Sequence, residues 1–430
     1  MDLLQGTTLT TVNNQIITVL NKIGSGGQGD VYRCQYLGGV YALKWYHKNI
    51  LKKYVGFEEN LKENAASGPP TQDFLWPLDV TNDYDGVFGY VMPLIPASYR
   101  SFSDFLLAKC RFSSLTAMID SALGIISGFR ELHKRGYSYQ DINDGNFFIE
   151  PETGRVLICD NDNIAPYGEN LGIAGKCRYM APEVVLGEKL PDVSTDKYSL
   201  SVILFMLIFM NHPLEGKGTM PPCMTENLER RYYAESPVFI YDKSDDSNRP
   251  VRGVHANVTA RWDVFPEEFR EAFTYSFSET VLQGREPRTI EKEWLKLFLK
   301  LKSQIIPCGG CGGETFYNPE KGKNVCINCG TKINLPVTLK TEEYNIPLYP
   351  GKHIFEFEIY PGIDDFKETV GIVTKGSKNP NLWGLRNISN DTWTTWDNQD
   401  EEQTTKSPNE VIRIKPGISI DFNGTIGNII

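Results

Sequence analysis

"YQDINDGNFFIE", residues 139–150, is the most informative stretch of this chain. It places Asp141 five positions before Asn146, and the apolar run 147–149 follows at once, as a strand would. Phosphoryl transfer uses such a pair, because a carboxylate can orient a hydroxyl while an asparagine side chain holds a magnesium ion. The spacing alone is a weak signal, so its interpretation depends on the residues on either side.

A glycine cluster lies upstream, between the two β-rich runs of "IITVLNKIGSGGQGDVYRCQYLGGVYALKWY", residues 16–46. Glycine has no Cβ, so the backbone there can approach phosphate oxygens closely. A dinucleotide-binding fold or a P-loop would need a helix directly after the glycines, whereas residues 30–34 read as a strand. The order is therefore strand, glycine loop, strand, and it fits either a phosphate-binding loop or a plain hairpin turn.

Two further polar residues interrupt apolar strands. Lys44 stands in "VYALKWY", where a buried lysine is costly unless it has a partner. A nucleotide phosphate and a helix carboxylate would provide one, and an exposed edge lysine is the alternative. The apolar run 156–159 ends on Asp160, whose carboxylate can complete a metal site with Asn146, since Mg²⁺ prefers oxygen ligands.

The composition is that of an acidic globular protein. The chain has 430 residues, with 40% hydrophobic and 23% charged, and 54 acidic residues against 44 basic ones give a net charge of −10. Such a balance disfavours nucleic-acid binding. The longest apolar run, residues 200–210, is shorter than the roughly 20 residues of a membrane span, so we expect a buried helix and no membrane association. With scattered lone cysteines and no recognisable signal peptide, we expect a reducing, cytoplasmic location.

Taken together, the first three hundred residues resemble a protein kinase domain. The glycine loop "GSGGQGDV" resembles G-x-G-x-x-G-x-V, and "YALK" resembles V-A-I-K. "YQDINDGN" stands where H-R-D-x-x-x-x-N belongs, "DND" where D-F-G belongs, and "APE" (181–183) matches outright. "RTIEKEW", from Arg288, resembles the late segment whose arginine pairs with the glutamate of A-P-E. Each motif is weak alone, but their common order is specific.

The resemblance implies a role for each matching residue. Lys44 would pair with the α- and β-phosphates, Asp141 would orient the acceptor hydroxyl, and Asn146 and Asp160 would hold magnesium. The hinge that grips adenine would be "YVMPLIP", residues 90–96. The residues expected to bind ATP, besides Lys44, are Gly24, Gly26, Gly27, Gly29, Val31, Ala42, Met92 and Leu94.

The helix carboxylate that would pair with Lys44 is left open by the sequence. Three glutamates, Glu58, Glu59 and Glu63, lie in "FEENLKENAASG", and the helix cannot be aligned securely without relatives. Each of the three remains a candidate.

Several positions depart from the family pattern. Tyr139 and Gln140 replace His-Arg, so a phosphorylated activation loop would lack its usual arginine, and we expect activity that does not depend on such phosphorylation. Asn143 replaces a lysine that helps neutralise the moving phosphate, and Lys176 replaces a threonine. Asp162 replaces the glycine of D-F-G, and we expect it to face water, the alternative being an additional metal ligand. Because the four residues that touch nucleotide, metal or hydroxyl survive, we favour an active, atypical kinase over a pseudokinase.

A four-cysteine segment follows, with the spacing Cys308-x2-Cys311-x14-Cys326-x2-Cys329. Two C-x-x-C pairs at this spacing predict a tetrahedral structural zinc site, closed to substrate by its fourth thiolate. The segment has almost no apolar core of its own, so metal binding would be what folds it. The alternative is four free structural cysteines.

The last stretch, from about residue 335, predicts a small β-sandwich. "KHIFEFEIY", "ETVGIVTK", "EVIRIKPG" and "SIDFNG" alternate or run apolar over short lengths between turn residues. "LWGLRNIS" and the closing strands resemble the second half of a forkhead-associated (FHA) fold, but that family's phosphothreonine-binding Gly-Arg and Ser-Arg-x-His are missing. A domain that docks on the kinase or on a partner is the expectation, with Trp383, Trp393 and Trp396 in its core.

The predicted fold class is α+β. A bilobal kinase domain spans 1–303, with its N-lobe at about 1–92 and its C-lobe at about 97–303; a zinc ribbon spans 304–334 and an FHA-like sandwich 335–430. This order resembles the bacterial kinases of tellurite-resistance-associated stress-response triads, which implies a protein substrate and, as partners, a von Willebrand factor A protein and a phosphatase. The predicted function is an ATP- and magnesium-dependent Ser/Thr protein kinase, and the alternative is a nucleotide-binding pseudokinase scaffold.

Overall fold

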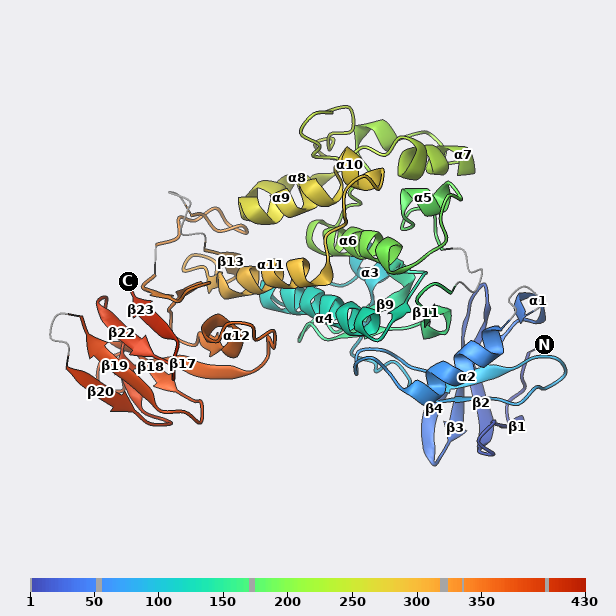
Figure 1. Cartoon of the computed structure of the whole chain (residues 1–430), viewed down its shortest axis with the longest axis horizontal. Helices are drawn as coiled ribbons and strands as arrows, with labels where there is room; N and C mark the ends of the chain where they lie inside the picture. Colours follow the sequence, from blue (N-terminus) through green and yellow to red (C-terminus); the bar gives the residue numbers. More distant parts are fainter. Residues whose placement is uncertain (1, 52–55, 170–174, 318–323, 335, 399–401) are drawn as a thin grey trace. The chain divides into compact units, whose positions relative to one another are not determined.

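The computed structural model describes residues 2–51, 56–169, 175–317, 324–334, 336–398 and 402–430. Figure 1 shows the chain coloured along its sequence. It divides into two compact units, of which the first comprises residues 1–111, 124–260 and 270–291, and the second comprises residues 112–123, 261–269 and 292–430. Mixed helices and sheets build the first unit, and the chain ends in a β-rich region.

An antiparallel sheet of six strands opens the first unit, and alternating burial explains how it forms. In the third strand, buried and more exposed positions alternate, as expected where one face packs on a core and the other meets solvent. The second and third strands form the hairpin that carries the glycines, which confirms the order strand, glycine loop, strand. In sheet order the strands are β1 (Thr8–Thr10), β2 (Ile16–Ser25), β3 (Gly29–Tyr36), β4 (Gly39–Tyr46), β6 (Gly89–Met92) and β5 (Asp79–Val80).

Two helices follow β4: α1 (Lys48–Leu51) and α2 (Phe57–Ser67), seen beside the sheet in Figure 1. The buried face of α2 repeats at positions i, i+3, i+4 and i+7, namely Phe57, Asn60, Leu61 and Asn64. The two apolar residues of this face join a core cluster with Tyr46 and Tyr90. The two asparagines lie on the same face of α2 and are therefore buried as well.

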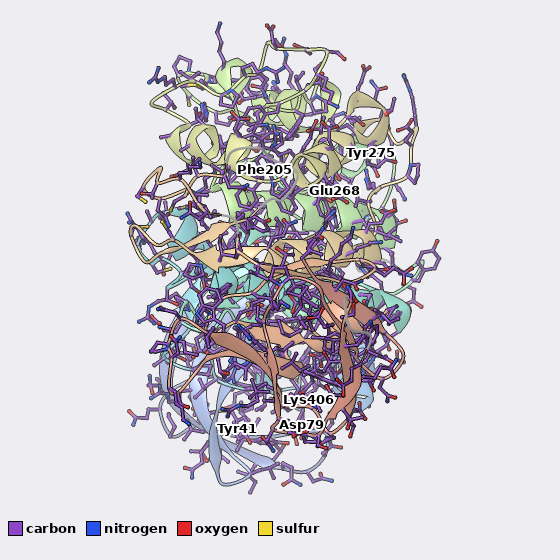
Figure 2. The ribbon with its side chains drawn as sticks, turned by 90° about the vertical axis from the view of Figure 1, so that its left-hand side faces the viewer. Tyr41, Asp79, Phe205, Glu268, Tyr275 and Lys406 are labelled. Atoms are coloured by element: carbon purple, nitrogen blue, oxygen red, sulfur yellow. The ribbon has the colours of Figure 1, made fainter. Side chains whose placement is uncertain are left out.

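The helical part of the first unit is organised around α6 (Val193–Phe209), which contains the long apolar run. Nearly all of this helix is buried, as expected for a core helix, and its N-terminus is closed by a reciprocal capping pair of Asp192 and Thr195. Phe205, labelled in Figure 2, packs its ring against those of Phe209 and Phe273. No helix among the described residues combines the length and apolarity needed to cross a bilayer.

The other helices that lie wholly or partly in this unit are α3 (Phe102–Leu106), α4 (Leu115–Lys134), α5 (Pro182–Val185), α7 (Glu226–Arg230), α8 (Ala256–Arg261), α9 (Glu267–Ser276) and α10 (Glu279–Leu282). Small antiparallel sheets carry the loops of the site. They are formed by β7 (Arg100–Ser101) with β9 (Phe147–Ile149) and β10 (Val156–Ile158), and by β8 (Tyr137–Ser138) with β11 (Ala165–Pro166).

The second unit begins its C-terminal part with α11 (Glu291–Ser303) and the hairpin of β12 (Ile305–Pro307) and β13 (Glu314–Phe316). Lys302, on α11, is nearly buried, and its Nζ lies 2.6 Å from Asp120 Oδ1 and 2.7 Å from the carbonyl oxygen of Phe366. A buried ammonium group requires such partners. This lysine therefore fixes the end of α11 against other segments of its own unit.

Two antiparallel sheets form the C-terminal β-rich region. The first runs β15 (Asn345–Pro347), β14 (Thr338–Lys340), β23 (Ile426–Ile429), β22 (Ile418–Asp421), β19 (Trp393–Asp397) and β20 (Gln403–Lys406). The second runs β16 (His353–Phe355), β17 (Thr369–Lys375), β18 (Trp383–Asn387) and β21 (Val411–Arg413), and α12 (Glu356–Ile359) follows β16.

The two sheets pack through Trp393. A Cβ built on Gly371, in the second sheet, would stand 3.2 Å from the ring of Trp393, in the first sheet. Trp393 is fully buried, as predicted for a core residue, whereas Trp383 and Trp396 are only half-buried. The tight approach needs glycine at position 371, where a side chain would push the sheets apart.

Candidate active site

The loop between β8 and β9 brings Asp141 and Asn146 together. The side-chain amide of Asn146 donates to the Asp141 carbonyl oxygen at 2.8 Å, and that of Asn143 donates to Asp141 Oδ1 at 3.1 Å. Burial raises the pKa of the Asp141 carboxyl to about 6, against the lowering effect of the Asn143 hydrogen bond. Asp141 is thus a half-buried carboxylate of raised basicity, suited to accept a proton.

A buried aspartate that the sequence motifs did not single out holds the backbone of this loop. Asp196, on α6, accepts the backbone N–H of Tyr139 at 2.6 Å and that of Gln140 at 3.0 Å. It also lies 3.1 Å from Nε2 of His133, whose Nδ1 lies 2.7 Å from Glu291. The backbone just before Asp141 is therefore held by a carboxylate that is 2% exposed.

The two residues in place of His-Arg make contacts of their own. Tyr139 is fully buried, and its hydroxyl donates to the Cys159 carbonyl oxygen, just before Asp160. Gln140 adopts a positive φ of 70° and donates its amide to the carbonyl oxygen of Glu169. A neutral side chain therefore holds the start of the segment after β11. The rest of that segment includes residues 170–174, outside the described residues, so independence from its phosphorylation stays a prediction.

The charge state of His133 gives a testable pH dependence. Hydrogen bonds to Asp196 and Glu291 outweigh burial and raise the pKa of His133 to about 9. A folded pKa above the unfolded value of 6.5 adds stability below pH 6.5, and this stability is lost as the pH rises to about 9. At 1.36 kcal/mol per pKa unit the contribution is roughly 3 kcal/mol.

We expect the urea midpoint of the wild type to fall more steeply between pH 6.5 and 9.5 than that of His133→Gln, which cannot carry the charge. Equal pH slopes in the two proteins would show that His133 is neutral in the folded state.

Lys44 has two carboxylate partners, and neither comes from α2. Its Nζ lies 2.7 Å from Asp162 Oδ2 and 3.3 Å from Asp160 Oδ1, while Gln28 Oε1 accepts from it at 3.1 Å. Tyr46 adds a hydrogen bond from its hydroxyl to Asp162 at 2.5 Å. The expectation of a partnered, buried lysine on this strand is confirmed, since Lys44 is 5% exposed.

The expectation that Asp162 faces water was wrong. Its side chain is completely buried. Its Oδ2 has the charge of Lys44 and the Tyr46 hydroxyl as partners, as a carboxylate away from water requires, and its Oδ1 has no hydrogen-bond partner among the described residues. A position that holds glycine in the family pattern thus provides the main carboxylate partner of the strand lysine.

The three glutamates considered for that role lie elsewhere. Glu58 pairs with Lys62 at 2.6 Å, and Glu59 and Glu63 are exposed. The face of α2 that points inward carries Asn60 and Asn64 instead. Both donate to the Ile164 carbonyl oxygen, at 2.8 and 3.0 Å. Helix α2 is therefore tied to the backbone after Asp162 and not to Lys44.

The strand pair β9–β10 places the two predicted magnesium ligands. Phe147 pairs with Ile158, and the Cys159 N–H donates to the Asn146 carbonyl oxygen at 2.9 Å, so Asp160 follows directly beside Asn146. Asp160 has a left-handed backbone, with φ 55°, and its side chain is 43% exposed. An accessible carboxylate beside an amide oxygen is the donor set that Mg²⁺ prefers, so these residues fit the ion.

The glycine loop approaches the backbone of β4 closely at one point. A Cβ on Gly29 would stand 2.4 Å from the Trp45 carbonyl oxygen, so this position requires glycine. The turn is closed by a hydrogen bond from the Gly26 N–H to the Gly29 carbonyl oxygen at 2.8 Å. Gly24 lies at the end of β2, and Gly27 has open space around it.

Four of the residues expected to bind ATP pack together. Val31 and Leu94 pack against the cluster that contains Ala42 and Met92, and Ala42 pairs with Met92 across β4 and β6. Farther along the chain, Arg288 donates to Glu183 Oε2 at 2.7 Å, the pairing that the late motif implied.

The four clustered cysteines form a group compatible with a zinc site. Their sulfurs lie within 4.8 Å of one another, and the pairs Cys308–Cys329 and Cys311–Cys326 are each 3.7 Å apart. A tetrahedron with Zn–S bonds of about 2.3 Å has sulfurs about 3.8 Å apart, so the spacing fits the ion. The N–H groups of Gly310 and Asn328 point at sulfurs at 3.3 Å, as thiolate ligands require.

The sequence missed Asp162, Asp196 and the asparagines of α2 as parts of the site. The asparagines had a signal, because they share the i, i+3, i+4, i+7 face with Phe57 and Leu61. Asp162 and Asp196 had none, since nothing local in the sequence marks a carboxylate as buried.

One family model and several known proteins are similar to part of this chain. A family model described as protein kinase domain matches residues 17–250. Rhodopsin kinase GRK1 of Rattus norvegicus is 28% identical over 204 residues, covering 46% of this chain and 36% of the relative. Beta-adrenergic receptor kinase 1 of Homo sapiens is 29% identical over 208 residues, covering 46% and 29%.

A bacterial relative is similar over a shorter stretch. The probable serine/threonine-protein kinase PknB of Bifidobacterium longum is 29% identical over 105 residues, covering 23% of this chain and 15% of the relative. The chain thus spans about a third or less of the length of these curated relatives. Among solved structures, the PknI kinase domain of Mycobacterium tuberculosis has a TM-score of 0.40 and 20% identity, covering 50% of this chain and 81% of that one.

Proposed function

This chain belongs to the protein kinase family, since the kinase domain match covers more than half of it, and from that premise we propose an active, ATP- and magnesium-dependent kinase for serine and threonine hydroxyls of proteins. One observation carries the proposal. Three separate parts of the chain meet in one site: Lys44, Asp160, and the loop that carries Asp141 and Asn146. Their proximity supports roles toward phosphate, metal and hydroxyl.

The proposed reaction uses these residues as follows. The acceptor hydroxyl oxygen forms a bond to the γ-phosphorus, and the bond from that phosphorus to the β,γ-bridging oxygen breaks, so its electron pair leaves with ADP. Asp141 takes the hydroxyl proton, and its pKa of about 6 leaves it ionised at neutral pH. Asn146 and Asp160 would hold magnesium, which supplies positive charge to the phosphates when bound.

Substrate, setting and domain division rest on the resemblance and remain proposals. The order of kinase, four-cysteine segment and β-rich region supports a role in bacterial stress signalling, with a von Willebrand factor A protein and a phosphatase as partners. A cytoplasmic location is supported by the nine cysteines, all within the described residues and none in a disulfide. The proposed division remains 1–303, 304–334 and 335–430, with an FHA-like sandwich last.

The test is to detect phosphorylated serine or threonine in a protein acceptor. The purified chain is incubated with ATP, magnesium and a generic protein acceptor, and phosphorylated residues are located by mass spectrometry. We expect phosphoserine and phosphothreonine with the wild type and none with Asp141→Asn. ATP that binds tightly to the wild type without any phosphopeptide would replace this proposal with the nucleotide-binding scaffold.

We also propose that the four cysteines bind one structural zinc ion. Cys308 and Cys326 are buried and belong to a small cluster with Ile306, Tyr317 and Ile333. Zinc would bind the four sulfurs as thiolates, releasing their protons, and the bonds to one ion would hold this cluster closed.

We expect one zinc per chain by native mass spectrometry. Cys326→Ser should lose the metal and make residues 304–334 sensitive to protease, because metal binding supplies the folding energy of such segments. The control is Cys223→Ser, an exposed cysteine outside the cluster, which should keep the zinc. A metal-free chain that resists protease as well as the loaded one would contradict the proposal.

A further inference from the structure

Lys176 lies beside the loop that carries Asp141 in the proposed active site. Its Nζ is 3.1 Å from Asp144 Oδ1, and its side chain is 57% exposed. A Cβ on the preceding Gly175 would stand 3.2 Å from Asp141 Oδ1, so the backbone at this point abuts the catalytic carboxylate. A Cβ on Gly145 would stand 3.6 Å from Lys176 Nζ, which places the ammonium group beside the same loop.

Among the described residues of the site, the positive charge of Lys44 is already engaged. Asp160 and Asp162 both pair with Lys44, so the charge of Lys44 is already shared between two carboxylates. The residue that contacts Asp141 Oδ1 directly is Asn143, a neutral amide. Lys176, by contrast, carries a positive charge beside the same loop.

Phosphoryl transfer needs positive charge close to the transferring phosphoryl group. Negative charge spreads over the equatorial oxygens of the transferring group, and a positive group aimed at those oxygens stabilises the transition state more than the ground state. Lys176, on a flexible stem, can leave Asp144 for such a target, because an ion pair with one exposed partner is weak. Asp144, whose side chain is 20% exposed, then keeps its hydrogen bond from the Ser103 hydroxyl.

We propose that Lys176 is a catalytic residue that leaves Asp144 and contacts the transferring phosphoryl group as the acceptor attacks. This inference rests on the proposed kinase function. While the new bond from hydroxyl oxygen to phosphorus forms and the bond to the bridging oxygen of ADP breaks, Asp141 takes the proton and Lys176 keeps its own. Its role is to neutralise the negative charge on the phosphoryl group while that group passes from ATP to the acceptor oxygen.

The experiment compares four variants of the full chain with the wild type. Lys176→Met removes the cation, Lys176→Arg keeps it, and Lys176→Met with Asn143→Lys returns a cation from the neighbouring loop position. Lys189→Met is the matched control, since Lys189 is also an exposed lysine paired to an aspartate, Asp192, at 2.8 Å.

We expect Lys176→Met to lower kcat about 10²-fold with little change in the KM for ATP, as removal of one transition-state donor does. Lys176→Arg and the double variant should recover most of the rate, and Lys189→Met should match the wild type.

A binding readout separates a catalytic role from a structural one. The affinity for ADP with aluminium fluoride and magnesium, which mimics the transferring group, should fall about 10²-fold in Lys176→Met, while the affinity for ADP alone stays within threefold. A variant that loses both affinities equally would show that Lys176 merely supports the loop, and this result would overturn the proposal.

The other outcomes are also distinct. If Lys176→Met is as active as Lys189→Met, the assignment of Lys176 is wrong while the kinase function stands. If the wild type binds ATP but transfers no phosphate to any protein acceptor, the proposed function fails and the role of Lys176 falls with it.

Discussion

Replacing Asp162 with asparagine is expected to lower kcat/KM for ATP at least 10²-fold. Lys44 is buried, and Asp162 is its nearer carboxylate, at 2.7 Å and fully buried. Asparagine has nearly the same shape but no charge, so the lysine would be left to Asp160. A lysine drawn fully to Asp160 would compete for the carboxylate that is proposed to hold magnesium.

The same substitution should also destabilise the first unit. Removing one partner of a buried ion pair typically costs about 3–5 kcal/mol, because the other charge stays buried and uncompensated. Asparagine can keep one hydrogen bond, so the lower end of that range is expected. Urea midpoints and steady-state kinetics on the same preparations measure both effects.

Two controls define the result. The triple variant Glu58→Gln, Glu59→Gln, Glu63→Gln should keep its kcat/KM within about twofold, since these side chains are exposed or paired with Lys62. Adding Asp162→Asn to Lys44→Met should cost little more than Lys44→Met alone, because residues that act as one unit are not additive. A triple variant that loses activity while Asp162→Asn keeps it would return the anchoring role to α2.

Replacing Asp196 with alanine is expected to have the second large effect. This carboxylate accepts two backbone N–H groups, from Tyr139 and Gln140, and pairs with His133. Alanine leaves two buried donors unsatisfied and His133 with Glu291 alone. Together these losses should cost about 3–5 kcal/mol of unfolding free energy.

Activity should fall as well, because Asp141 follows directly after this anchored backbone. A displacement of about 1 Å in a catalytic group can cost roughly 10²-fold in rate. The control is Asp192→Ala, which lies at the start of the same helix and caps it. That variant should cost about 1 kcal/mol and leave kcat unchanged. Equal losses in both variants would show that Asp196 acts only on the helix.

Much of the first unit could be predicted from the chain alone, because its signals are local. The hairpin around Gly29 follows from glycines between β-rich runs, and the pair Asp141 and Asn146 is fixed by a short loop before a strand. The pairing of Arg288 with Glu183 was implied by motif order alone. In each case the residues that matter are close in sequence or belong to an ordered set of motifs.

The electrostatic partners could not be predicted in this way. Asp162 and Lys44 are 118 positions apart, and an aspartate in a loop is ordinarily solvated. Only the fold brings Lys44 and Tyr46 over Asp162 and makes burial tolerable there. The helix glutamates failed as candidates for a related reason. Their charge favoured them, but the buried face of α2 is set by Phe57 and Leu61, and the polar residues on that face are asparagines.

Because two aspartates, and not a glutamate of α2, pair with Lys44, the site is held together differently from the expectation. Lys44 takes its carboxylates from the segment that also contains the proposed magnesium ligand Asp160, and α2 is tied through Asn60 and Asn64 to the Ile164 carbonyl oxygen of that same segment. Lys44 and helix α2 therefore both contact residues 160–164. A shift of α2 would not by itself break an ion pair to Lys44.

The most direct measurement is the initial rate of γ-phosphate transfer from labelled ATP to protein, for the wild type and Asp141→Asn, with ATP binding titrated in both. We expect transfer by the wild type and a rate roughly 10³-fold lower in the variant, as loss of a general base implies, with ATP affinities within threefold. Equal label in both proteins, or none from a wild type that binds ATP, would contradict catalysis by Asp141 and with it an active kinase.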